Sequence, residues 1–130
     1  MVAAGGYQES LLDQHKKSRV GAVGILQVIP KLAAAAPIDI SNVTNADGNM
    51  QAGCKILRHI TDTYFNDPGI NPLNQALFTF ASYNAGPNKI VGLPKQAQND
   101  GLDPNLWLGN VELEVAKGVG EETVGYVSTL

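Results

Sequence analysis

Three polar side chains lie at the edges of strongly apolar segments, and their types suit chemistry on a sugar polymer. Glu9 follows the opening segment MVAAGGYQ, Gln27 lies within GILQVIP, and Asn84 ends the apolar stretch FTFASYN. A carboxylic acid in apolar surroundings has a raised pKa, so it can donate a proton near neutral pH. Amides and aromatic rings supply the hydrogen bonds and flat faces that sugars need. The pattern indicates a cleft lined by amides and a tyrosine, with Glu9 as its acid.

An ordinary structural explanation fits the same residues. Asn84 could cap the end of its helix, Gln27 could bond to a nearby backbone group, and Glu9 could be a surface group. A buried asparagine without partners costs roughly 1–3 kcal/mol, so Asn84 must find partners in either case. The residues alone leave both explanations open.

Other kinds of site find less support in the sequence. The net charge is −3, and the only basic cluster is HKKSR at residues 15–19, which a solvated loop explains as well as an anionic ligand does. A nucleic-acid surface would need a concentrated basic face, so we expect none. The single cysteine, Cys54, lies on the apolar side of a helical pattern, where we expect a buried thiol. We expect no metal and no cofactor.

The elements that must position these side chains are mainly helical. With 130 residues, of which 44% are hydrophobic, the chain can bury a core as one domain. Residues 2–9 could be the stub of a longer helix, residues 10–20 a loop, and residues 21–30 a short buried strand or a tight turn. Further helices are predicted at residues 31–36, 47–65, 72–84, 88–99 with a break near residue 92, 103–117 and 120–130.

Some of these helices carry predicted caps and faces. Asp47 or Asn49 can cap the second of them, and Asp103 can cap the helix that we expect to reach Lys117. The helix at 72–84 has almost no polar face, so we expect it to be central and buried.

Four short motifs occur in a fixed order along nearly the whole chain. They are QES at 8–10, GAVGILQVIP at 21–30, FASYNAGP at 80–87 and ETVGYV at 122–127, with NMQAGCKIL between the second and the third. In this order they resemble the catalytic domain of the soluble lytic transglycosylases, a lysozyme-superfamily group close to goose-type lysozyme. The extended matches are similar to the branch that includes membrane-bound lytic transglycosylase F. The resemblance implies a mainly α, lysozyme-like fold with a substrate cleft.

The resemblance also assigns roles to single residues. Glu9 becomes the only catalytic acid and base, and Ser10 its motif partner. The remaining substrate-binding positions are Gln27, Tyr83, Asn84 and Tyr126. Three departures accompany the match: Leu26 replaces a usual methionine, Ser82 replaces an alanine, and the helix before Glu9 is shorter than in the family.

The implied reaction is cleavage of peptidoglycan between N-acetylmuramic acid and N-acetylglucosamine, with a 1,6-anhydro product. Two alternatives remain: a hydrolytic muramidase on the same fold, and a silent peptidoglycan-binding module. Ordinary glycosidases use two carboxylates, but Asp13, although close to Glu9 in sequence, belongs to no motif that lines the cleft.

The setting follows from the implied substrate. We expect residues 1–130 to be one catalytic domain, a fragment of a longer exported protein, acting as a monomer on glycan strands in the periplasm or cell envelope. No apolar run approaches the ~20 residues of a membrane span, and the start lacks the features of a signal peptide. Membrane association would therefore come only through flanking segments absent from this chain.

Overall fold

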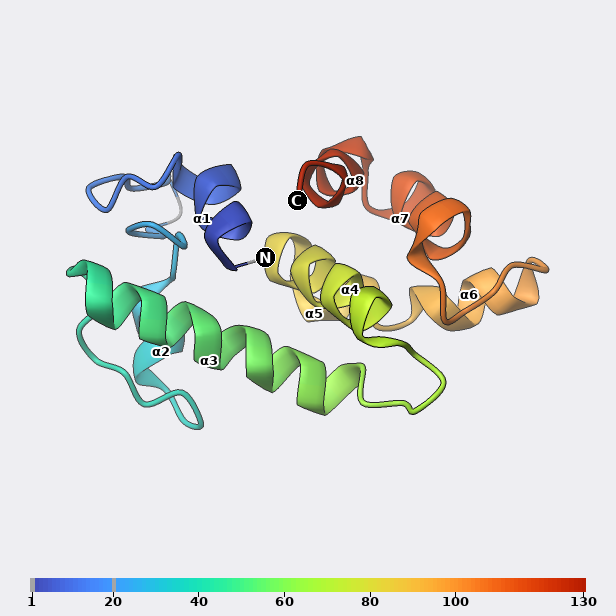
Figure 1. The fold of residues 1–130 in the computed structure, drawn as a ribbon, viewed down its shortest axis with the longest axis horizontal. Helices are drawn as coiled ribbons and strands as arrows, with labels where there is room; N and C mark the ends of the chain where they lie inside the picture. The colour runs from blue at the N-terminus through green and yellow to red at the C-terminus, as the bar shows by residue number, and fades with distance from the viewer. Residues whose placement is uncertain (1, 20) are drawn as a thin grey trace. The chain divides into compact units, whose positions relative to one another are not determined.

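The structure is a computed structural model that describes residues 2–19 and 21–130 (Figure 1). Within these residues, helices and loops make up the fold, and isolated bridges pair Val23 with Lys17 and with Val28. This confirms the expected mainly α, lysozyme-like class. The chain divides into two compact units, one ending at Arg58 and the other running from His59 to Thr129. The boundary falls within one helix.

The first unit contains α1 (Val2–Ser10), α2 (Pro30–Ala34) and the first part of α3 (Ala46–Tyr64). The segment 21–30 is a tight turn and not a strand, because Val23 and Val28 exchange backbone hydrogen bonds of 2.8 and 2.9 Å. Pro30 opens α2 at a position where a missing N–H costs nothing. α3 begins one residue earlier than predicted. Asn45, and not Asp47 or Asn49, caps it by accepting a hydrogen bond from the Gly48 N–H.

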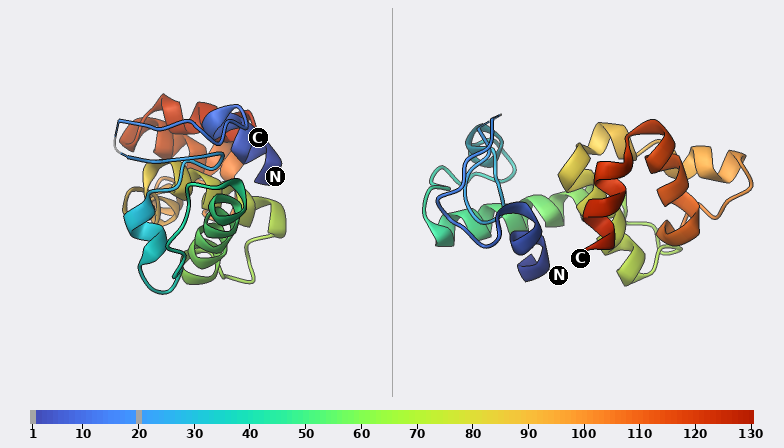
Figure 2. Two further views of the ribbon diagram at one scale, coloured as in Figure 1. Left: turned by 90° about the vertical axis from the view of Figure 1, so that its left-hand side faces the viewer. Right: turned by 90° about the horizontal axis from the view of Figure 1, so that it is seen from above.

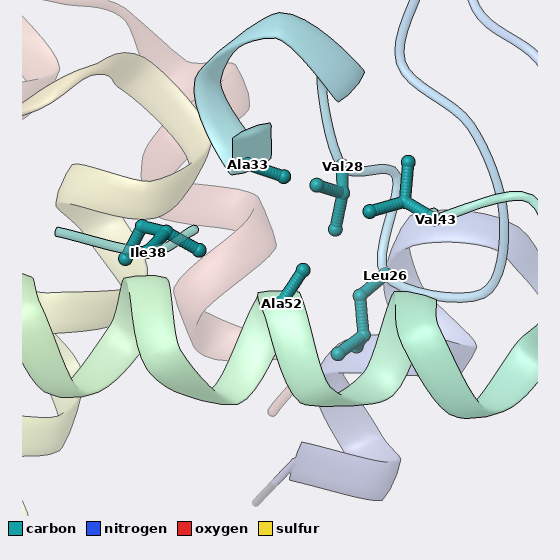
Figure 3. Packing of buried hydrophobic residues seen from close by; sticks show 6 residues of the cluster. All are labelled: Leu26, Val28, Ala33, Ile38, Val43 and Ala52. Atoms are coloured by element: carbon teal, nitrogen blue, oxygen red, sulfur yellow. The ribbon is translucent and has the colours of Figure 1, made fainter. Parts of the chain in front are cut away.

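Apolar side chains from four segments form the core of this unit: the turn at 21–30, α2, the loop that follows α2, and α3. Figure 3 shows six of them: Leu26, Val28, Ala33, Ile38, Val43 and Ala52. Gly53 lets Leu26 pack directly on α3, because a Cβ at residue 53 would overlap the leucine side chain. The turn at 21–30 is thereby anchored on α3 by burial of apolar surface.

The second unit contains the end of α3, followed by α4 (Pro72–Ala85), α5 (Pro87–Ile90), α6 (Leu93–Asn99), η1 (Trp107–Val111), α7 (Glu112–Gly118) and α8 (Glu121–Ser128). The views in Figure 2 show α8 lying beside α4, against which it packs. Three aromatic rings support the unit: Phe65 stacks on Phe78 at 5.4 Å, and Phe78 meets the edge of Trp107 at 6.0 Å.

The helix predicted from Asp103 to Lys117 is wrong in its first half. Leu108 has an extended ψ of 122° and Gly109 a φ of 71°, so the regular helix α7 begins only at Glu112. Asp103 instead holds a short turn by accepting from the Asn105 N–H at 2.9 Å.

Two expectations about burial also need correction. Phe78, Phe80 and Ala81 of α4 are buried as predicted, but Leu73 near its start is 61% exposed. Cys54 is exposed, so the expected burial of its thiol is wrong. The inward face of α3 runs through Leu57 and Ile60. None of the helices described here is long and apolar enough to cross a membrane.

Candidate active site

Glu9 is the penultimate residue of α1 and is half-buried. Its main-chain carbonyl oxygen accepts a hydrogen bond of 3.2 Å from the ammonium group of Lys16. A cation at this end of a helix complements both the unpaired carbonyl groups and the negative end of the helix dipole. Lys16 thus stabilises the turn of helix on which Glu9 stands.

Ser10 connects that turn to the segment that carries Gln27. Its hydroxyl group is almost fully buried and lies 3.0 Å from the carbonyl oxygen of Gly6 and 2.6 Å from that of Ile25. The bond to Gly6 stays within α1, whereas the bond to Ile25 spans to the turn at 21–30. The hydroxyl is therefore engaged inside the first unit, and its predicted contact with substrate stays a prediction.

Asn49 holds the same turn from the side of α3. This buried amide accepts from the Leu26 N–H at 2.8 Å and donates to the carbonyl oxygens of Val23 and Val43 at 2.7 and 2.9 Å. Gly24, with a φ of 81°, lies against the Asn49 side chain, where a Cβ would collide with it. Sequence reasoning treated Asn49 only as a possible cap. The available indication was its place on the same face of the helix as Ala46, Ala52 and Ile56, where a buried amide must find hydrogen-bond partners.

Gln27 adopts a left-handed backbone conformation, with a φ of 49°. Its side chain is half-buried, and Nε2 donates to the carbonyl oxygens of Gly24 at 2.7 Å and Lys16 at 3.0 Å. A non-glycine residue held in this region stores strain, which collects at functional sites. No donor to Oε1 is found among the residues described, so this oxygen can accept a hydrogen bond from a ligand. The predicted backbone contact of Gln27 is confirmed, and it leaves a binding role open.

Tyr83 and Asn84 lie in the last turn of α4, in the second unit, and both are half-buried. The helix is capped by Gly86, with a φ of 96°, so the structural explanation of Asn84 as a cap is wrong. Instead, Asn84 Oδ1 accepts a hydrogen bond of 2.8 Å from the hydroxyl group of Thr123 in α8. Tyr126, one turn further along α8, is 6% exposed.

The structure thus brings the six predicted residues together in two groups. Glu9, Ser10 and Gln27 share the first unit, and the others share the second, on the paired helices α4 and α8. Thr123, which sequence reasoning missed, joins these two helices. Asp13 is exposed, and its Oδ1 accepts from the His15 N–H at 2.9 Å. Within the described part of the chain, no group of three or more metal-binding side chains occurs.

A carboxyl pair lies outside both groups. The side chain of Glu114 on α7 is fully buried, and no hydrogen-bond donor reaches either oxygen among the residues described. The nearby Asp100 carboxyl group, followed by burial, raises the pKa of Glu114 above its ordinary value. Lys117, 3.6 Å from Glu114, opposes this shift.

An apolar pocket of about 290 Å³ opens elsewhere in the second unit. Its lining comes from α4, η1 and the ends of α7 and α8: Leu73, Asn74, Leu77, Leu106, Trp107, Leu108, Glu112, Val127 and Ser128. None of the six predicted site residues belongs to it, so the pocket is separate from the candidate site.

Comparison with known proteins gives a consistent result. The family model of the transglycosylase SLT domain matches residues 1–104, which include five of the six predicted site residues and exclude Tyr126. A "membrane-bound lytic murein transglycosylase F" from Pseudomonas syringae pv. syringae (strain B728a) is 33% identical over 108 residues, covering 83% of this chain and 21% of the relative. A protein of the same name from Desulfosudis oleivorans is 31% identical over 107 residues, covering 82% of this chain and 23% of the relative. The chain thus spans about a fifth of the length of these relatives.

Proposed function

Since the chain belongs to the transglycosylase SLT domain family, we propose that it is a peptidoglycan lytic transglycosylase with Glu9 as its acid and base. The bond cleaved is the β-1,4 bond between N-acetylmuramic acid and N-acetylglucosamine. The product carries a 1,6-anhydromuramoyl end. The reaction needs no cofactor, and its setting is the cell envelope, where a monomer acts on glycan strands.

The proposed reaction uses the Glu9 carboxyl group twice, first as an acid and then as a base. Protonated Glu9 gives its proton to the glycosidic oxygen as the bond to C1 of the muramic acid breaks. The acetamido group of the substrate stabilises the positive charge that develops at C1. The Glu9 carboxylate then takes the proton of the C6 hydroxyl group as that oxygen bonds to C1. No water is consumed, and Glu9 ends as it began.

One observation supports this proposal most directly: Ser10, the neighbour of Glu9, donates to Ile25 at 2.6 Å. The bond fixes the end of α1 against the turn that carries Gln27, and Asn49 fixes that turn against α3. A catalytic group is effective only when its surroundings hold it in place. This arrangement is what an acid and a neighbouring substrate-binding amide require.

The remaining site residues supply complementary contacts. Gln27 offers the acceptor Oε1 to a sugar hydroxyl group, and Asn84 offers a donor. Tyr83 provides a ring face and a hydroxyl group for the sugar, and Tyr126 positions the substrate or Glu9. Together they provide polar groups of the kinds that a carbohydrate site needs.

Digestion of purified sacculi with this chain tests the proposal. We expect mass spectrometry to find muropeptides with anhydro ends. Reducing ends would identify a hydrolytic muramidase instead. Retention of the chain on sacculi without any released product would identify a silent binding module, and either result would overturn the proposal.

A further inference from the structure

The hydrogen bond between Thr123 and Asn84 sets the direction of the Asn84 amide. The Thr123 hydroxyl group donates to Oδ1 at 2.8 Å, and the threonine is only 4% exposed. A hydroxyl group in this surrounding has few water molecules to exchange with, so the bond is persistent. Because threonine is branched at Cβ, its χ1 angle is also restricted. The carbonyl end of the amide is thereby directed at α8.

The bond from Thr123 to Asn84 is unusual for a threonine near the start of a helix. Thr123 is the third residue of α8, and this helix has no side-chain cap. A threonine near a helix start usually bonds to the local backbone. Here the hydroxyl group instead reaches α4 and bonds to a half-buried side chain.

The opposite end of the amide is left available. Throughout the described part of the chain, no acceptor is found for Asn84 Nδ2. Because the bond from Thr123 turns Oδ1 towards α8, the Nδ2 donor is the end of the amide that Asn84 can offer to a ligand. A freely rotating amide would present a donor or an acceptor with similar ease.

We propose that Thr123 is a positioning residue that makes Asn84 a dedicated hydrogen-bond donor to an acceptor oxygen of the glycan. This inference rests on the proposed function, because it takes Asn84 to contact the substrate. It adds Thr123, which is not among the six predicted site residues. It also specifies that Asn84 donates, and does not accept, the hydrogen bond to the glycan. Thr123 itself touches no substrate.

Two substitutions separate the hydroxyl group from the shape of the side chain. Thr123→Val keeps the branched shape and loses the donor, whereas Thr123→Ser keeps the donor. The matched control is Thr79→Val, because Thr79 on α4 is 2% exposed and its hydroxyl group lies 2.7 Å from that of Thr61. This control loses a buried hydroxyl hydrogen bond away from Asn84.

The experiment measures kcat/KM on sacculi, the Kd for peptide-free glycan strands in Glu9→Gln variants, and the Tm. Loss of one orienting hydrogen bond should raise Kd and lower kcat/KM about fivefold in Thr123→Val. Thr123→Ser should stay within about twofold of the parent, and Thr79→Val should lower Tm to a similar degree without changing Kd. In an Asn84→Ala background, Thr123→Val should have no further effect on Kd, because its partner is absent.

Three results would overturn the inference: equal changes of Kd in Thr123→Val and Thr79→Val, full additivity of Thr123→Val with Asn84→Ala, or no effect of Asn84→Ala on Kd. The binding measurement separates this failure from failure of the proposed function. A chain that releases no product but binds glycan in a Thr123-dependent manner would overturn the transglycosylase proposal and support the role of Thr123.

Discussion

The hydroxyl oxygen of Ser10 lies 2.6 Å from the main-chain carbonyl oxygen of Ile25, although fifteen positions separate them in the sequence. This bond links the helix end that carries Glu9 to the turn that carries Gln27. Two of the four sequence motifs thus meet through a single buried hydroxyl group.

Ser10→Ala should lower both stability and activity. The substitution removes the one hydroxyl proton that lies within reach of the Gly6 and Ile25 carbonyl oxygens. The Ile25 carbonyl loses this donor, at a cost of about 1–2 kcal/mol in the free energy of unfolding. Activity should fall because the turn is no longer fixed to α1. Urea unfolding and product release from sacculi measure the two effects.

Ser128→Ala is the matched control, because the exposed Ser128 makes only a bond to the carbonyl oxygen of Val124 four residues earlier. Its cost should stay within about 0.5 kcal/mol. If the two alanine variants were equally stable and active, the bond to Ile25 would have no positioning role.

Asn49→Ala should be among the most destabilising substitutions in the first unit. It removes three hydrogen bonds between a fully buried amide and the backbone, so we expect a loss of about 3 kcal/mol or more. Gln51→Ala, an exposed position on the same helix, should cost about 0.5 kcal/mol or less. Similar urea midpoints for the two variants would contradict the role of Asn49.

The sequence predicted most helices, because their signals are local. Pro72 and the AGP segment at 85–87 bracket α4, and the structure has this helix at Pro72–Ala85. The failures come from tertiary contacts. The Asp103 helix is broken by Gly109. The turn at 21–30 is held on α3 by packing of Leu26 against Gly53 and by the hydrogen bonds of Asn49. Periodicity cannot reveal such contacts.

Cys54 should react with a thiol reagent in the folded protein, because the structure exposes it. Labelling with dithiobis(nitrobenzoic acid), an aromatic disulfide, should reach about one equivalent without denaturant, because an exposed thiol can exchange with the disulfide. Cys54→Ser should show no labelling. A requirement for denaturant would restore the buried position that the sequence suggested.

The carboxyl pair of Glu114 and Asp100 should make stability depend on pH. Because the pKa of Glu114 is raised in the folded chain, folding favours the protonated form. This contribution is present below the ordinary glutamate pKa of roughly 4.3 and is lost as the pH rises through the raised value. Glu114→Gln should therefore gain stability relative to the parent chain as the pH rises from about 4 towards about 7.

Thermal unfolding at several pH values measures this difference. Glu121→Gln, an exposed change of the same type on α8, should leave the pH profile nearly unchanged. Parallel Tm profiles for Glu114→Gln and the parent chain would contradict the raised pKa of Glu114 in the folded protein.

The sequence was sufficient to predict the site residues that belong to motifs. It was not sufficient to predict the residues that orient them. Gln27 and Asn84 stood out as amides at the edges of apolar segments. Thr123 did not, because a threonine near a helix start is ordinary, and its bond to Asn84 joins residues 39 positions apart. Residues that act through long-range bonds carry little local signal, so only the folded chain reveals them.

Product release by Glu9→Gln tests the central claim most directly, with Asp13→Asn as a control that makes the same change four residues away. Both variants and the parent chain are incubated with purified sacculi, and anhydro-muropeptides are quantified by mass spectrometry. We expect Glu9→Gln to keep the parent's circular dichroism spectrum and lose at least about 10²-fold in rate, while Asp13→Asn retains most activity. Near-normal release of product by Glu9→Gln would contradict the account.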